Sequence, residues 1–264
     1  MTNRILVAED FSSIGDISLK TALTVYNILG ISNAALPVEL LSSHFGWDKQ
    51  PEQVMTTTWL NLTLHHWNVD FGGVYLGYLG SNELVHTFTK YLKYKDFPTV
   101  IDPAMADHGK MYAGLKSKYV HKMRNLIKQA TVITPNLSEA EFLLDHRIVN
   151  IKKALQELSH KIAGQQVVIT SFEKNSKIGC VYLDGDKAKT VLYPKADKHL
   201  FGSGDLFASI LSALIFASNL SWADAVKTAT KITALAVKRT SAKQRDVQIS
   251  TIVNELVELK EAIK

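Results

Sequence analysis

The sequence predicts an α/β protein, a three-layer α/β/α fold with a mainly parallel central sheet and a late β-hairpin. Strand-like and helix-like segments alternate over most of the 264 residues, which is the order of βαβ units. The alternation breaks at Asp184-Gly185-Asp186, because an Asp-Gly pair between two apolar runs indicates a hairpin. No repeat, low-complexity stretch or long linker divides the chain, so residues 1–264 are expected to form a single domain.

In the first half of the chain, short apolar runs predict strands and runs with helical spacing predict helices. The expected strands are Ile5–Ala8, Ser32–Pro37, Gly73–Leu76 and Thr99–Ile101. The expected helices are Ser18–Leu29, Pro51–Asn68 and Asn82–Tyr94. Gly30 should end the first helix, since glycine adopts the left-handed conformation that closes helices. Pro51 should lie in a first helical turn, where proline is tolerated.

The second half continues the pattern and ends in helices. The expected strands are Thr131–Thr134, Gln166–Thr170 and the hairpin strands Ile178–Leu183 and Thr190–Tyr193. The expected helices are Leu115–Gln129, Ser138–Leu144, Ile151–Ile162, Ser203–Ala217, Trp222–Arg239 and Gln248–Ala262.

Composition excludes several classes of protein. The net charge of +5 is spread over the chain, without the concentrated basic stripe of a nucleic-acid-binding module. No apolar stretch reaches the ~18–20 residues that span a bilayer, so no membrane partner is expected. The only cysteine, Cys180, rules out an internal disulfide and suits a reducing cytoplasm. It lies in a strand-like run, where a buried inert thiol is expected.

The most informative motif is Gly202-Ser203-Gly204-Asp205, placed before the apolar run Leu206–Phe216. Two glycines let backbone amides approach a ligand closely, and a helix N-terminus favours anions. A carboxylate repels a phosphate, so Asp205 needs a reason to be there, and taking a proton from an attacking hydroxyl is one. An ordinary loop is the alternative. The motif is not a dinucleotide fingerprint, because Phe207 stands at the third glycine position.

Polar residues follow several expected strands, and the carboxyl ends of parallel strands share one rim of the sheet, where ligands bind. They are Glu9-Asp10, Asp102, Thr134-Pro135-Asn136 and Thr170-Ser171. Asp102, Asp107 and Glu139 could hold Mg²⁺ together with substrate phosphates, since this ion prefers oxygen ligands. Alternatively, Asp102 or Asp107 caps a turn, and Glu139 completes a capping interaction at its helix start. His44 could face a ligand or be an ordinary surface histidine.

Together these segments resemble the ribokinase-like superfamily and, within it, the pyridoxal/pyridoxamine (vitamin B6) kinase family. The resemblance covers nearly the whole chain, as a single ribokinase-like kinase domain. Its segments are 10–15, Leu36-Pro37 with 41–46, Gly77–Ser81, Asp102–Tyr112, Thr134–Glu139 and 202–209. Gly77–Ser81 and Asp102–Tyr112 point to the vitamin B6 branch rather than to sugar kinases.

The resemblance implies ATP-dependent phosphorylation of the 5′-hydroxymethyl group of pyridoxal, pyridoxamine or pyridoxine, the chemistry of vitamin B6 salvage. Asp205 would be the catalytic base, and the amides of Gly202, Ser203 and Gly204 would form the anion hole. The implied ATP-binding residues are Asn136, Glu139, Thr170, Ser171, Asp102 and Asp107, with Asp102 and Glu139 near Mg²⁺. The implied vitamer contacts are Asp10, His44, Phe45 and Tyr78. A K⁺ ion is common in the family, and similar enzymes are usually homodimers.

The chain departs from the family pattern at three places. Phe45 stands where a threonine usually bonds the substrate ring, Ala106 replaces a usual glycine, and His199-Leu200-Phe201 is bulkier than the usual approach to the glycine motif. Two alternative functions follow. One is a kinase of hydroxymethylpyrimidine, and the other is a protein that binds nucleotide or vitamer without catalysis.

Overall fold

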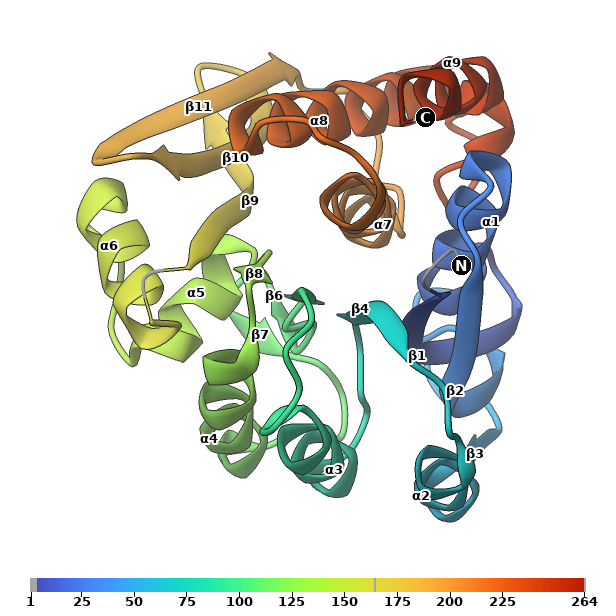
Figure 1. The fold of residues 1–264 in the computed structure, drawn as a ribbon. Helices are drawn as coiled ribbons and strands as arrows, with labels where there is room; N and C mark the ends of the chain where they lie inside the picture. The colour runs from blue at the N-terminus through green and yellow to red at the C-terminus, as the bar shows by residue number, and fades with distance from the viewer. Residues whose placement is uncertain (1–3, 164, 264) are drawn as a thin grey trace.

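The computed structural model describes residues 4–163 and 165–263 as a twisted sheet covered by helices on both faces (Figure 1). The sheet has nine strands in the order β11-β10-β9-β8-β5-β4-β1-β2-β3. They are β1 (Arg4–Ile14), β2 (Asn33–Ser43), β3 (Gln53–Met55), β4 (Phe71–Leu76), β5 (Thr99–Ile101), β8 (Val132–Ile133), β9 (Gln166–Lys174), β10 (Lys177–Asp184) and β11 (Lys187–Pro194). A separate two-stranded sheet pairs β6 (Ala106–Asp107) with β7 (Lys110–Met111).

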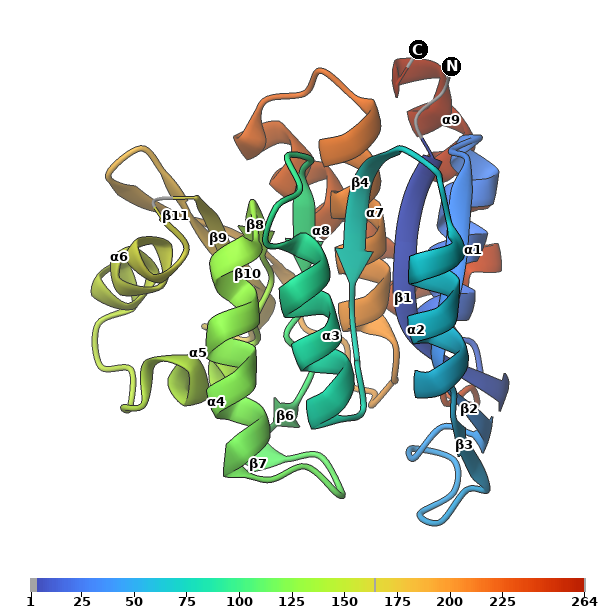
Figure 2. The same cartoon turned by 60° about the horizontal axis from the view of Figure 1, so that its bottom comes forward.

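Helices lie on both faces of the sheet (Figures 1 and 2), and a hydrophobic core on each face holds them against it. One face carries α2 (Thr57–His66), α3 (Asn82–Leu92), α4 (Ser117–Leu126), α5 (Leu137–Leu144) and α6 (Ile151–Lys161). The other carries α1 (Ser18–Leu29), α7 (Ser203–Ala217), α8 (Trp222–Arg239) and α9 (Val253–Ile263). Short 3₁₀ helices, η1 (Ile127–Gln129) and η2 (Ile249–Ile252), follow α4 and precede α9. The predicted three-layer α/β/α fold is therefore confirmed.

The strand pairing also agrees with the predicted mainly parallel sheet and late hairpin. β2, β1, β4, β5, β8 and β9 are joined by parallel pairs, and the antiparallel pairs lie toward the two edges. Asp184 pairs with Lys187, so Gly185 and Asp186 make the turn, with Gly185 at φ 58°. Gly30 ends α1 at φ 73°, as expected.

The expected helix Pro51–Asn68 is wrong in its first part. Gln53–Met55 forms the edge strand β3, which pairs antiparallel with Leu41–Glu39 of β2, and the helix begins only at Thr57. The hydroxyl of Thr56 donates to the carbonyl of Pro37 at 2.5 Å and helps to separate strand from helix. A pairing partner elsewhere in the chain thus overrides the local helical pattern.

Other expected elements differ mainly in length. β1, β2 and β9 run several residues beyond the expected strands, Thr131–Thr134 shortens to Val132–Ile133, and the last helix begins as the 3₁₀ helix η2. Within the residues that the structure describes, no helix is long and apolar enough to cross a membrane.

Candidate active site

The glycine motif forms the start of α7, as predicted. Gly202 precedes the helix at φ 82°, and a side chain there would bring its Cβ within 2.8 Å of Ile17 Cγ2. Only glycine therefore suits this position. In the described part of the chain, the predicted amides of Gly202, Ser203 and Gly204 make no hydrogen bond with protein, and neither does the amide of Asp205. A Cβ on Gly204 would meet nothing within 4 Å, so an anion can approach this helix end.

The start of α1 holds the carboxylate of Asp205. The amide of Ser18 donates to its Oδ2 atom at 3.0 Å. Burial raises the pKa of Asp205, and the Ser18 amide opposes that shift. A half-buried carboxylate with a raised pKa, beside the free amides of Gly202, Ser203 and Gly204, can accept a proton from a bound hydroxyl. The role of Ser18 was not predicted from the sequence, although its place after the first strand was a usable signal.

Three further acidic side chains lie within electrostatic reach of Asp205. Burial and the Asp205 charge raise the pKa of Asp102 to about 8. Burial, followed by the charges of Asp205 and Glu39, raises the pKa of Asp10 to about 7. The pKa of Glu9 lies well above its usual value for the same main reason, burial. The structure thus brings together the predicted residues Asp10, Asp102 and Asp205 in a region that favours protons or cations.

Glu139 and Asn136 form the capping interaction that was left open as an alternative. Asn136 Oδ1 accepts the amide of Glu139 at 3.0 Å, and Glu139 Oε2 accepts the amide of Asn136 at 2.8 Å. Glu139 Oε1 also accepts the amides of Met105 at 3.0 Å and Ala106 at 3.4 Å. Both oxygens of this buried carboxyl group are therefore engaged, and they fasten α5 to the loop that follows β5.

Asp107 also follows its alternative interpretation, because its Oδ1 atom accepts the amide of His108 at 2.8 Å and so caps the turn between β6 and β7. Thr170 pairs with Asn136 in a short parallel bridge. The amide of Thr170 donates to the carbonyl of Pro135 at 2.9 Å. Ser171 is exposed at φ 54°. Thr170 and Ser171 occupy a β-bulge, which bends the strand at the rim.

On the expected vitamer side, Phe45 has an exposed ring, Tyr78 is half-buried and His44 is buried. Phe45 is 39% exposed, and the Tyr78 ring lies 6.3 Å from the ring of Tyr112. Burial raises the pKa of Tyr78. His44 is only 3% exposed, so the surface interpretation is wrong. Its two ring nitrogens bond to Asp246 and to the amide of Gly46, which leaves neither nitrogen free for a ligand.

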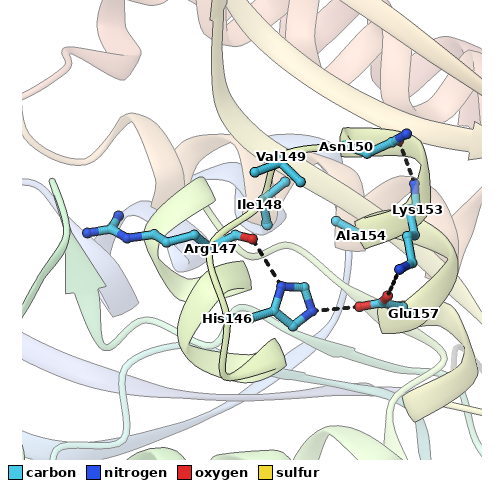
Figure 3. Close-up of a pocket in the computed structure, with 8 residues that line it drawn as sticks. All are labelled: His146, Arg147, Ile148, Val149, Asn150, Lys153, Ala154 and Glu157. Carbon is cyan, nitrogen blue, oxygen red and sulfur yellow. Dashed lines mark hydrogen bonds and ion pairs between the residues drawn. The ribbon is translucent and has the colours of Figure 1, made fainter.

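A surface pocket of about 360 Å³ lies away from this site, at the connection between α5 and α6 (Figure 3). Its charged groups are already paired: His146 Nε2 lies 2.8 Å from Glu157 Oε2, Lys153 lies 3.6 Å from Glu157 Oε1, and Arg147 pairs with Glu141 outside the lining. None of the predicted site residues lines it. The pocket is therefore not the candidate active site.

The parallel sheet, the free amides at the start of α7 and the acidic rim define an α/β protein of the ribokinase-like class. The phosphomethylpyrimidine kinase family matches residues 53–250, more than half of the chain. The chain belongs to this family.

Solved structures and curated relatives agree with that assignment. The crystal structure of pyridoxal kinase from Lactobacillus plantarum superposes with a TM-score of 0.92, at 32% identity over 99% of both chains. A Bacteroides thetaiotaomicron protein crystallised with pyridoxal gives 0.88, at 26% identity over 97% of this chain and 96% of that one. A Schizosaccharomyces pombe relative is 29% identical over an alignment that covers 67% of this chain and 57% of the relative. The chain thus spans less than two thirds of that relative's length.

Proposed function

We propose that the protein transfers the γ-phosphoryl group of ATP to the 5′-hydroxymethyl group of a B6 vitamer: pyridoxal, pyridoxamine or pyridoxine. The observation that supports this most directly is the placement of Asp205 beside the unpaired amides that begin α7. Proteins of similar structure support the same proposal, because they include a pyridoxal kinase and a protein crystallised with pyridoxal. The whole chain, residues 1–264, would act as one kinase domain.

In the proposed mechanism, Asp205 takes the proton of the vitamer hydroxyl as its oxygen attacks the γ-phosphorus of ATP. The bond from that phosphorus to the β–γ bridging oxygen breaks, and ADP leaves. The amides of Gly202, Ser203 and Gly204 would stabilise the charge on the migrating phosphoryl group. The raised pKa of Asp205 suits this role, because a base works best when its pKa lies near the working pH.

The nucleotide would lie along the α5 and β9 side of the rim, near Asn136, Thr170 and Ser171. Among the described residues, no group of three or more His, Cys, Asp or Glu side chains could hold a metal by itself. That suits Mg²⁺ carried with ATP phosphates, which needs only one or two protein carboxylates. Asp102 fits this role. Glu139 fits a positioning role instead, since both of its oxygens accept backbone amides. A bound Mg²⁺ ion would neutralise charge on the ATP phosphates. A K⁺ ion is proposed from the family resemblance alone.

The vitamer would lie between Asp10, Phe45 and Tyr78. Asp10 could bind the protonated pyridine nitrogen, because a carboxylate favours that cationic form. Phe45 can stack on the ring but cannot replace a threonine hydrogen bond. Hydroxymethylpyrimidine is the rival substrate, and the match to the phosphomethylpyrimidine kinase family keeps it in the comparison.

The test is ADP release with ATP and each of pyridoxal, pyridoxamine, pyridoxine and hydroxymethylpyrimidine. The wild-type protein should turn over at least one B6 vitamer faster than the pyrimidine. Asp205→Ala should lower kcat by about 10²–10⁴-fold while ADP still binds. Tight ligand binding by the wild type with no ADP release would instead favour the non-catalytic alternative.

We also propose a homodimer and a cytoplasmic location. The edge strand β3 and helix α2 expose apolar side chains, among them Val54 at 61%, Trp59 at 48% and Leu62 at 67%. Such a patch suits a second copy of the chain. Light scattering of the wild type and of Leu62→Glu would test the proposed dimer, with a dimer expected only for the wild type.

The proposed cytoplasmic location is supported by the free, buried thiol of Cys180, which suits a reducing compartment.

A further inference from the structure

One buried carboxylate, that of Asp246, lies where three segments of the candidate active site meet. Asp246 is 4% exposed and lies between α8 and η2. Its Oδ1 atom is 2.9 Å from Nε2 of His44. Its Oδ2 atom accepts the amide of Asp16 at 3.0 Å and the indole N–H of Trp47 at 3.2 Å. Donors from two distant parts of the chain thus converge on one carboxylate.

The hydrogen bonds around His44 define its tautomer. The amide of Gly46 donates to Nδ1 at 3.1 Å, so Nδ1 carries no proton. The proton is then on Nε2, which donates to Asp246. The neutral imidazole is therefore held from both sides, and this orients segment 44–47, which includes the exposed ring of Phe45.

The other contacts of Asp246 lead to the proposed base and to the anion-binding turn. Asp16 lies two residues before Ser18, whose amide holds Asp205. The residues on either side of Asp246 pair with Phe201: its amide donates to the carbonyl of Arg245 at 2.8 Å, and its carbonyl accepts the amide of Val247 at 3.0 Å. Phe201 directly precedes Gly202.

The segments around the Asp246 carboxylate are closely packed. A Cβ on Gly15 would lie 2.3 Å from His44 Cδ2 and 3.1 Å from Asp246 Oδ2. A Cβ on Gly46 would lie 2.7 Å from the ring of Phe201. Because these segments touch so closely, a shift of one must move the others.

We propose that Asp246 is a positioning residue for phosphoryl transfer: it sets the base Asp205, the turn before α7 and segment 44–47 relative to one another. This inference rests on the proposed function. Asp246 would touch neither substrate. Its contacts lie on the vitamer side of the site, whereas the proposed nucleotide residues belong to the α5 and β9 side. Loss of Asp246 should therefore affect the vitamer and the transfer step, and leave nucleotide binding intact.

The direct test is Asp246→Asn, which keeps the size of the side chain but has one acceptor oxygen in place of two. It cannot accept all three donors in the present geometry. We expect kcat/KM for pyridoxal to fall roughly 100-fold, because small misplacements of reacting groups have effects of this size. The fall should combine a lower kcat with a higher pyridoxal KM. The Kd of ADP should stay within about twofold of the wild type.

The matched control is Asp70→Asn, which makes the same change of charge at an exposed position before β4. It should behave as the wild type. Trp47→Phe is the second variant, since it removes one donor and keeps the carboxylate; we expect a loss of about tenfold in kcat/KM with ADP binding unchanged. If Asp246→Asn does not fold, Trp47→Phe decides the question.

The proposal is overturned if the folded variants keep kcat/KM within about threefold of the wild type, or if ADP affinity falls in parallel with activity. The second result would mean general disturbance of the fold rather than positioning. If the wild type binds pyridoxal but releases no ADP, the kinase function fails, and the Kd of pyridoxal for the same variants still tests Asp246. An unchanged pyridoxal Kd would then refute its positioning role.

Discussion

The hydrogen bonds of Glu139 lead to a prediction about stability. Glu139→Ala would remove the acceptor for the amides of Asn136, Met105 and Ala106, which bond to the carboxyl group at 2.8, 3.0 and 3.4 Å. Each buried donor left without a partner costs about 1–3 kcal/mol. The Ala106 bond is long and the Asn136 bond is only partly buried, so the full cost applies to Met105 and a partial cost to the others.

We therefore expect Glu139→Ala to lower the free energy of unfolding by about 2–4 kcal/mol. Burial and the charge of Asp102 raise the pKa of Glu139 well above its usual value. The substitution also removes a carboxyl group whose charge is disfavoured at this place, and this offsets part of the loss of stability. We therefore expect a loss no larger than about 4 kcal/mol. For a chain of this size, about 2–4 °C per kcal/mol gives a fall in Tm of about 4–16 °C.

The assay is thermal unfolding by circular dichroism without ligands. Glu139→Gln keeps one acceptor oxygen and should recover about half of the loss in Tm. The control is Glu173→Ala, which removes an exposed carboxylate paired with Lys195 at 2.7 Å; exposed pairs contribute about 0–1 kcal/mol. A Tm for Glu139→Ala within about 2 °C of the wild type would refute the structural role argued for this carboxylate.

The remaining predictions concern pH, the glycine turn and the vitamer ring. Because the pKa values of Asp102 and Asp10 are raised to about 8 and about 7, the folded protein binds more protons than the unfolded chain above pH ~4. Stability should fall as pH rises, on the order of 1 kcal/mol per pH unit for each carboxyl until the pH reaches its pKa, about 7 for Asp10 and about 8 for Asp102; Tm measured from pH 5 to 8 should change less steeply in Asp102→Asn. Gly202→Ala should lower both Tm and turnover, because the new Cβ would lie 2.8 Å from Ile17 Cγ2 at a positive φ; wild-type values for both would contradict the turn geometry. Asp10→Asn should raise the KM of pyridoxine, and an unchanged KM would exclude the pairing with the ring nitrogen.

Local signals explain which elements could be predicted from the sequence. The bounds of α7, α8 and β5 agree with the expected segments, because each is delimited by residues next to it in the chain. The strand β3 could not be found this way, since its pairing with Leu41–Glu39 is not visible in the pattern of residues 51–68. The same reason explains the added length of β1 and β2, whose ladders continue together to Ile14 and Ser43.

The candidate site likewise has some features that local sequence predicts and others that depend on residues far apart in the chain. The turn at Gly202 and the rim position of Asp102 follow from strand order and from a short motif. The partners of His44 and Glu139 do not. His44 bonds to a residue 202 positions away, and Glu139 bonds to amides 33 and 34 positions away. Only the folded arrangement shows that these two side chains are occupied by the protein itself.

Two of the three departures from the family pattern, at Phe201 and Ala106, are each matched by contacts with their neighbours, which argues against a site that has lost its function. Phe201, part of the bulky approach to the turn, packs edge-on against His44 at 5.4 Å between ring centroids. The same ring occupies the space that a side chain at position 46 would need, so Phe201 and Gly46 fit as a pair. Ala106 is fully buried, and both its amide and its carbonyl take part in the contacts with Glu139 and Asn136. Random loss of activity would not be expected to preserve such matched contacts around unpaired amides and a raised-pKa carboxylate.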